Sequence, residues 1–238
     1  MSCLAIVQAR MGSQRLPGKV LKTLGQRPVL EHVLRRVGYA QRVHHVVLAT
    51  TRLAQDDVLV DCAKKLGVHV VRGDEHNVLA RFFRASQLWP SHCIVRITAD
   101  CPCIDPSIID ETVRAHDEIR ADYTSNVHPR TYPRGLDVEV INTQALRIAY
   151  RSTVHPHDTE HVTPFIWRNQ HIFRVHNVTA PLWQKKAHWR LTLDTPRDFV
   201  ALQAVFDLIG KDNFRYVDLL TLARRYPWLP RINDSNIS

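Results

Sequence analysis

Three cations stand in a short glycine-containing segment that follows the first apolar run of the chain, at residues 4–7. They are Arg10, Arg15 and Lys19, and Gly12 and Gly18 lie between them. Guanidinium and ammonium groups bind phosphate oxygens, and glycine lets the backbone approach a ligand closely. The segment could therefore cradle several phosphates, although its charge alone is equally compatible with a solvated basic loop.

Two aspartates occupy equivalent places at the ends of predicted strands. Asp100 follows the apolar run 93–98, and Asp194 follows the run 189–193. Mg²⁺ binds few protein carboxylates and completes its shell with water and phosphate oxygens, so both aspartates are candidate ligands of a metal held with a polyphosphate. The alternatives are a turn role for Asp100 and a helix cap for Asp194, because Asp-Thr-Pro is a typical start of a helix.

Strand and helix patterns alternate through the first half of the chain. Apolar or alternating runs predict strands at 4–7, 45–50, 68–71, 93–98, 136–141, 171–178 and 189–193. Helical spacing predicts helices at 28–37, 55–66, 77–88, 106–119, 143–151, 196–209 and 216–225, and 123–134 has the composition of a long loop. Near-continuous apolar strands between helices indicate an α/β fold whose mainly parallel sheet is covered on both faces. Such sheets bind ligands at the carboxyl ends of their strands.

Size and composition fit one globular domain. The chain has 238 residues, of which 45% are hydrophobic, so we expect one domain over 1–238, with 125–190 as an insertion on the main sheet. No window approaches the run of about eighteen apolar residues that a membrane span needs. The first residues lack the features of a signal peptide, so we expect a cytoplasmic protein that does not bind a membrane.

Charge and cysteine content narrow the class of ligand. Lys and Arg total 32 against 23 Asp and Glu, a net charge of +9. The cations are scattered, which favours small anions over nucleic acid. The five cysteines form no disulfide or zinc pattern. The histidine cluster at 155–161 lacks the spacing of a known metal motif, so no metal is expected there.

The segment AIVQARMGSQRLPGKVL resembles the opening of the cytidylyltransferases that make CMP-activated acidic sugars. The branch that it most resembles is that of the spore-coat polysaccharide biosynthesis proteins, and the shared pattern is Ala9-Arg10, Gly12-Ser13 and Arg15-Leu16-Pro17-Gly18-Lys19. Further similar blocks are ATT at 49–51, VVRGDEHNVLARF at 70–82, RITADCPCIDP at 96–106, YTSN at 123–126, GLDVEVI at 135–141, EHVTPFIW at 160–167 and LTLDTPRDF at 191–199. The resemblance thus spans nearly the whole chain.

The resemblance implies a Rossmann-like nucleotide-diphospho-sugar transferase fold with a mixed seven-stranded sheet, and a homodimer that the insertion helps to form. It implies CTP and Mg²⁺ as ligands, with Asp100 and Asp194 binding the metal. Nucleotide binding carries over to Ala9, Arg10, Gly12, Ser13, Arg15, Lys19, Thr51, Arg72, Asn77, Arg81, Ala99 and Asp100. Of these residues, Arg10, Lys19 and Asp100 are implied to be catalytic.

The implied reaction transfers CMP from CTP to an acidic acceptor and releases pyrophosphate. A nonulosonic or 2-keto sugar acid is the first expectation, and a phosphonate or another small acid is the alternative. The residues expected near the acceptor are Asn126, Arg130, Arg134, Gly135, Glu160 and His161. One of the two arginines would pair with the acceptor's carboxylate, and His161 is the candidate base.

Three other classes of protein compete with this interpretation. A nucleic-acid binder is suggested only by the net charge of +9. A glycosyltransferase of a related fold would carry a DxD metal motif, and the sequence has none. A non-catalytic nucleotide-binding protein would be expected to lose Asp100 or Lys19, and both are present. The sequence therefore favours a nucleotidyltransferase.

Overall fold

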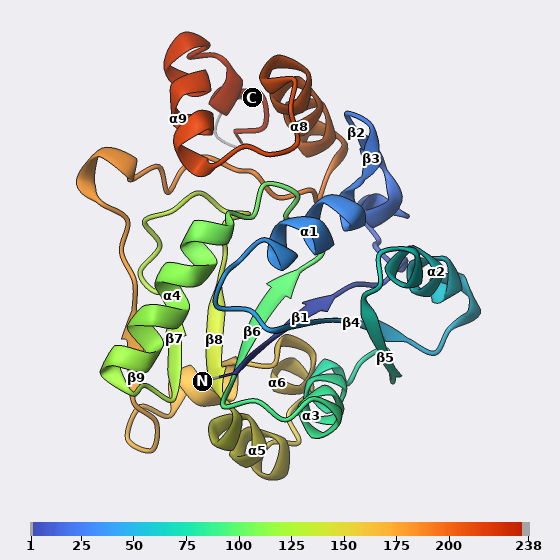
Figure 1. The fold of residues 1–238 in the computed structure, drawn as a ribbon, viewed down its shortest axis with the longest axis vertical. Helices are drawn as coiled ribbons and strands as arrows, with labels where there is room; N and C mark the ends of the chain where they lie inside the picture. Colours follow the sequence, from blue (N-terminus) through green and yellow to red (C-terminus); the bar gives the residue numbers. More distant parts are fainter. Residues whose placement is uncertain (1, 235–238) are drawn as a thin grey trace.

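A mixed sheet of seven strands forms the centre of the structure, a computed structural model that describes residues 2–234. The strands pair in the order β5-β4-β1-β6-β8-β7-β9 (Figure 1). Strand β8 is antiparallel to β6 and β7, and the other neighbouring pairs are parallel. The bounds are β1 Cys3–Gln8, β4 His45–Thr51, β5 His69–Gly73, β6 Cys93–Thr98, β7 Tyr123–Ser125, β8 Glu139–Asn142 and β9 Val175–Asn177, with a separate hairpin of β2 Thr23–Leu24 and β3 Arg27–Pro28.

Helices cover both faces of this sheet, and capping side chains fix where several of them begin. The Asp105 carboxylate accepts a hydrogen bond from the Ser107 amide at 2.7 Å at the start of α4, and Thr195 and Asp198 form a capping box at the start of α8. The bounds are α1 Val29–Gly38, α2 Asp57–Lys65, α3 Val78–Leu88, α4 Pro106–Ile119, α5 Thr143–Ser152, α6 Pro156–His161, α7 Pro164–Arg168, α8 Pro196–Ile209 and α9 Tyr216–Arg225. Single 3₁₀ turns are η1 Lys19–Leu21, η2 Ala54–Asp56, η3 Leu182–Gln184 and η4 Leu229–Arg231.

Alternation along the strands divides the core into two clusters, one on each face of the sheet. In β1, Ala5 and Val7 pack with residues of α1, α4, α8 and α9, whereas Leu4 and Ile6 pack with residues of α3 and α5 (Figure 1). The second face becomes polar toward the carboxyl end of β1, because Gln8 takes the next position on that face after Ile6. This change from apolar to polar marks the edge of the sheet where a ligand could bind.

The predicted α/β class with a mainly parallel sheet is confirmed, but the second half of the chain differs from the predictions in detail. The predicted loop 123–134 begins with strand β7, and the predicted strand 171–178 is regular only at Val175–Asn177. The predicted strand 189–193 is wrong: the only strand pairing of this segment with the rest of residues 2–234 is a bridge between Arg190 and Arg134. Its apolar residues pack in the core, but no strand in the described part of the chain runs alongside them. An apolar run predicts that a segment is buried and does not show whether another strand pairs with it.

Across residues 2–234, no helix has both the length and the apolar character that crossing a membrane would require.

Gly135 permits a close crossing of two chain segments and offers a test of the fold. Its φ is 103°, and a Cβ atom there would lie 2.4 Å from the carbonyl carbon of Leu191. We expect Gly135→Ala to lower the free energy of unfolding by at least about 2 kcal/mol, because the left-handed backbone and the contact with main-chain atoms both penalise a side chain. Urea denaturation followed by circular dichroism would measure the change.

The matched control is Gly38→Ala at the end of α1, where a Cβ atom would meet nothing within 4 Å. That variant should stay within about 1 kcal/mol of the wild type. Equal stability of the two variants would show that the crossing at Leu191 is not as close as the structure has it.

Candidate active site

A cavity of about 670 Å³ lies where strands β1 and β6 end. Both predicted chemical features reach it, the cation segment after β1 and the two aspartates that follow 93–98 and 189–193. The lining residues are Gln8, Ala9, Arg10, Gly12, Ser13, Gln14, Arg15, Lys19, Val20, Glu75, His76, Val78, Arg81, Thr98, Ala99, Asp100, Glu160, His161 and Asp194. The cavity is therefore built mainly from polar and charged side chains.

Buried Asp56 anchors the cation segment to the sheet. Its carboxylate accepts a hydrogen bond from the Met11 amide at 2.8 Å and another from the Thr51 hydroxyl at the end of β4. Farther along the segment, Gly18 adopts a left-handed conformation with a φ of 65°, and η1 then begins at Lys19. The turn thus directs Lys19 into the cavity.

Lys19 joins the two aspartates. Its Nζ lies 2.5 Å from Asp100 Oδ2 and 2.7 Å from Asp194 Oδ1. Burial opposes the charge of Lys19, but the contacts with Asp100 and Asp194 outweigh that effect and raise its pKa. Burial likewise opposes the charge of Asp194, but the bond from Lys19 dominates and lowers the pKa of that carboxyl. Lys19 and Asp194 are therefore charged near neutral pH.

Asp194 reaches Asp100 because the segment before it is bonded to the turn after β6. The Leu193 amide donates to the main-chain oxygen of Asp100 at 2.8 Å. Arg190 holds Asp194 from the other side, with its Nη2 2.7 Å from Oδ2, and also bonds the capping residue Asp198. Asp194 is thus fixed by main-chain and side-chain contacts even though the predicted strand is absent.

Arg10 stands between two carboxylates at another part of the cavity. Its guanidinium lies 3.4 Å from Glu75 and 3.4 Å from Glu160, which belongs to α6. His161 follows Glu160, and its pKa is lowered by burial and then by the neighbouring His157. His161 is consequently uncharged near neutral pH, with a ring nitrogen able to accept a proton.

Arg81 is the side chain that most needs a ligand. Only 3% of it is exposed, it lines the cavity from α3, and its Nε and Nη1 have no hydrogen-bond partner among the described residues. Burial, and then the charge of Arg10, lower the pKa of Arg81 to about 10, so it is still a cation. A Cβ atom on Gly73 would lie 2.6 Å from Arg81 Cγ, so glycine at the end of β5 leaves room for this stem.

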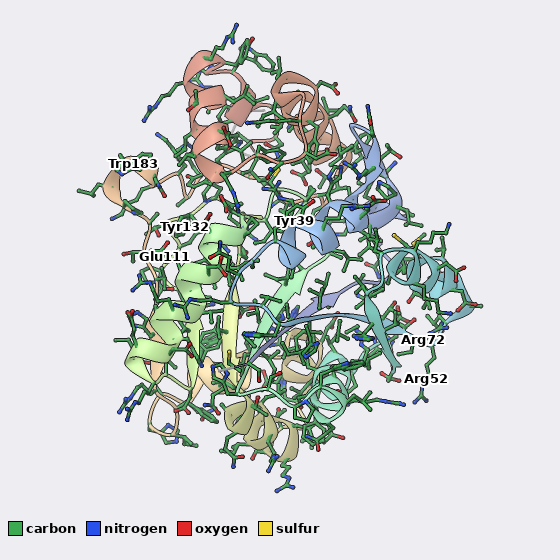
Figure 2. All side chains as sticks on the ribbon, in the orientation of Figure 1. Tyr39, Arg52, Arg72, Glu111, Tyr132 and Trp183 are labelled. Carbon is green, nitrogen blue, oxygen red and sulfur yellow. The ribbon has the colours of Figure 1, made fainter. Side chains whose placement is uncertain are left out.

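Twelve of the residues predicted from the sequence line the cavity: Ala9, Arg10, Gly12, Ser13, Arg15, Lys19, Arg81, Ala99, Asp100, Glu160, His161 and Asp194. Three predicted nucleotide-binding residues do not. Thr51 bonds Asp56, and Asn77 caps α3 by accepting from the Ala80 amide at 2.9 Å. Arg72 bonds the Thr51 carbonyl and pairs with Asp57, near the outer edge of the sheet by β5 (Figure 2).

Four residues predicted to lie near the acceptor are also outside the cavity lining. Asn126 is fully buried, and its amide bonds main-chain atoms of Leu136 and Val138. Arg130 is paired with Asp137 through both nitrogens of its fork. Arg134 and Gly135 lie where the chain crosses the segment around residue 190.

Sequence reasoning missed several lining residues, chiefly Gln8, Thr98, Glu75 and His76. Gln8 and Thr98 are the last residues of two neighbouring parallel strands and are register partners. The rule that ligands bind at strand carboxyl ends could have identified both of them. Glu75 and His76 lie in the 70–82 block, between residues that were predicted.

The two aspartates fit a magnesium site completed by the substrate. Their carboxylates both reach one lysine nitrogen, so an ion could contact both. Within residues 2–234, no three His, Cys, Asp or Glu side chains gather in a group that could hold a metal ion. Two carboxylates with phosphate and water oxygens are nevertheless a common environment for Mg²⁺.

Comparisons with known proteins identify similar chains. Residues 4–217 match the sequence model of a family described as Cytidylyltransferase. The spore coat polysaccharide biosynthesis protein SpsF of Bacillus subtilis is 34% identical over 230 residues, covering 94% of this chain and 95% of that protein.

Solved structures agree with this match. A cytidylyltransferase from Leptospira borgpetersenii superposes with a TM-score of 0.91 at 31% identity, covering 99% of this chain and 98% of its own. A CMP:2-keto-3-deoxy-manno-octonic acid synthetase complexed with CTP has a TM-score of 0.63 at 18% identity, covering 88% of this chain and 99% of its own. At that identity the second likeness shows a shared fold.

The unpartnered Arg81 leads to a stability prediction. Buried donors without partners cost about 1–3 kcal/mol, so Arg81→Met should raise the free energy of unfolding by about 1 kcal/mol or more in ligand-free protein. Thermal and urea unfolding would measure this.

Arg36→Met is the matched control, because Arg36 is equally buried but donates to the carbonyls of Ile104, Asp212 and Phe214. Its loss should lower the free energy of unfolding by at least about 3 kcal/mol. If Arg81→Met destabilised the protein as much as Arg36→Met, Arg81 would have native partners and no need of a ligand.

Proposed function

We propose that this chain, which belongs to the cytidylyltransferase family, transfers CMP from CTP to a nonulosonic or 2-keto sugar acid and releases pyrophosphate. The observation that carries the proposal is one cavity that holds the loop cations, the paired carboxylates and a buried arginine without a partner. These groups match the parts of a nucleoside triphosphate: an anionic chain, its metal and a base with hydrogen-bond acceptors.

The loop cations would bind the triphosphate. Arg15 and Lys19 already contact carboxylate oxygens, and phosphate oxygens are equivalent anionic acceptors. Gly12 and Ser13 also line the cavity, and the Gly12 backbone could approach the chain of phosphates closely. Phosphoryl and nucleotidyl transfers depend mainly on positioning and on stabilising charge, which cations at the departing pyrophosphate would provide.

Asp100 and Asp194 would hold Mg²⁺ with the nucleotide. When bound, the ion would neutralise charge on the phosphate oxygens and favour the ionised form of the attacking hydroxyl. Lys19 bridges the carboxylates in the present structure, and the triphosphate would offer its ammonium group new acceptors. Lys19 and the metal would then each be contacted by both carboxylate and phosphate oxygens.

Arg81 would recognise the base. Its two unpartnered nitrogens are donors, and cytosine offers a carbonyl oxygen and a ring nitrogen as acceptors. A buried guanidinium that gains such partners recovers the cost of its desolvation, so recognition there would be strong. This role agrees with the nucleotide binding that the resemblance implies for Arg81.

The acceptor would lie beside Glu160 and His161, which line the cavity from α6. The hydroxyl of the sugar acid would attack the α-phosphorus in line, and uncharged His161 could take its proton. Neither Arg130 nor Arg134 lines the cavity, so the expected pairing with the acceptor's carboxylate through them is not supported. A phosphonate or another small acid is the alternative acceptor within the same reaction.

The homodimer and the cytoplasmic location stay predictions. Within the predicted insertion, Leu182 and Trp183 are 84% and 57% exposed, and Figure 2 shows Trp183 projecting from the molecule. Exposed apolar side chains are compatible with a contact to a second copy.

A pyrophosphate-release assay tests the reaction. The protein is mixed with Mg²⁺, each of the four nucleoside triphosphates and a panel that includes 2-keto-3-deoxy-manno-octonic acid, N-acetylneuraminic acid and simple phosphonates. Release should require CTP and a sugar acid together. Asp100→Asn should reduce the rate by at least about 100-fold, because the carboxylate charge is lost at the metal, while the protein stays folded.

Asp207→Asn on the exposed side of α8, where Gln203 is the one hydrogen-bond partner of Asp207 within residues 2–234, is the matched control and should keep the wild-type rate. Absence of pyrophosphate with every pair of substrates would refute the proposed function. Full activity of Asp100→Asn would remove Asp100 from the metal site.

Lys19 leads to a separate prediction about metal binding. Because its ammonium group bridges the carboxylates, Mn²⁺ used as a Mg²⁺ substitute should bind the wild type weakly without nucleotide. Lys19→Met should bind Mn²⁺ alone about tenfold more tightly, yet gain less affinity when CTP is added. Electron paramagnetic resonance of unbound Mn²⁺ measures both affinities.

Lys22→Met is the matched control, since Lys22 lies over the Phe199 ring outside the cavity lining. Unchanged Mn²⁺ affinity in Lys19→Met would show that Asp100 and Asp194 do not form the metal site.

A further inference from the structure

A row of polar side chains lies on the sheet directly beneath the cavity. Gln8, Arg96 and Glu139 occupy neighbouring strands β1, β6 and β8 on the face that is otherwise packed with Leu4, Ile6 and similar residues. Gln8 lines the cavity, whereas Arg96 and Glu139 are not among its lining residues. The row therefore connects a residue of the cavity lining, Gln8, to the charged side chains of Arg96 and Glu139.

Arg96 fixes the orientation of the Gln8 amide. Arg96 Nε donates to Gln8 Oε1 at 3.0 Å, and because a guanidinium has only donors, the oxygen of the amide has to face it. The amide nitrogen, Nε2, therefore points away from Arg96. Gln8 Nε2 has no hydrogen-bond partner in the described part of the chain, so its two hydrogens are available to a molecule in the cavity.

Arg96 is itself held by a buried carboxylate. It pairs with Glu139, and the side chains of the pair are 13% and 9% exposed. Glu139 also accepts from the Tyr123 hydroxyl at 2.5 Å and from the Thr163 hydroxyl at 2.7 Å. Burial opposes the charge of Glu139, but Arg96 and these donors outweigh it and lower its pKa, so the carboxylate is ionised.

Burying this ion pair costs desolvation energy that apolar side chains at the same places would avoid. Ile6 on β1 and Ile94 on β6 show that the same face accepts apolar residues one position earlier. The pair therefore has a role other than packing. In the structure, Arg96 holds the Gln8 amide so that its N–H donors face the cavity.

We infer that Gln8 determines specificity for the acceptor by donating from Nε2 to the carboxylate of the sugar acid, with Arg96 and Glu139 as positioning residues. The inference rests on the proposed function. It places Gln8 on the acceptor side because the row continues through Thr163, two residues after His161 and next to α6. A carboxylate suits this place, since Arg130 and Arg134 lie outside the cavity lining and the fixed amide presents two donors.

The first test compares Gln8→Met with the wild type, using 2-keto-3-deoxy-manno-octonic acid and N-acetylneuraminic acid as acceptors. Methionine keeps the length of the side chain and removes the donors. We expect kcat/KM for the sugar acid to fall about 10- to 100-fold while the KM for CTP stays within about twofold. Gln87→Met, on an exposed position of α3, is the matched control and should change neither constant.

The second test concerns the positioning pair. Arg96→Met alone leaves Glu139 buried without its partner and could unfold the protein, so Arg96 and Glu139 are both changed to methionine. The double variant should show the same selective loss of kcat/KM for the sugar acid, because the amide can then rotate. Adding Gln8→Met to it should cause little further loss, whereas a merely structural pair would give additive effects.

The outcomes separate this inference from the proposed function. If the wild type releases no pyrophosphate from CTP with any sugar acid, the proposed function fails and this inference with it. If the wild type is active and Gln8→Met leaves kcat/KM for the sugar acid unchanged, the inference alone is overturned. A rise in the KM for CTP in place of the acceptor effect would also overturn it, because Gln8 would then belong to the nucleotide side.

Discussion

Lys19, Asp100 and Asp194 form the ionic cluster on which the candidate site depends. They come from three distant parts of the chain, and one ammonium nitrogen contacts both carboxylates at 2.5 and 2.7 Å. The cluster needs the turn at Gly18 and the bond between Leu193 and the main chain of Asp100. It satisfies the charges in the absence of ligand and presents the same groups that a metal-bound triphosphate would use.

Elsewhere in the cavity, cations are likewise paired with carboxylates. Arg10 lies between Glu75 and Glu160, and Arg190 supports Asp194 from behind. Arg81 is the exception, because its buried donors have no partner among the described residues. A buried cation without a partner lowers the stability of the ligand-free protein, and a role in ligand binding explains why it is there. Binding sites are where such conflicts between stability and function are expected.

One face of the sheet changes from apolar to polar side chains along its strands, and the polar part contributes to the site. Ile6 and Ile94 pack against the helices, and the next residues on that face, Gln8 and Arg96, are polar. A strand period of two places these residues together, so the same geometry that builds the core also places the floor of the cavity. The fold thus connects core packing with the orientation of the amide of Gln8.

The sequence by itself determined the family, the α/β class, most helix bounds and the three cations with both aspartates, because local patterns and contiguous motifs carry that information. It did not reveal that Asn126 and Arg130 form contacts within the chain, and it was wrong about 189–193, which is not a strand. Tertiary structure alone decided that Arg81 lacks a partner and that Arg96 orients Gln8. Both facts depend on which residues from distant parts of the chain come into contact. They also depend on burial, because a polar group without a hydrogen-bond partner is costly only where water cannot reach it.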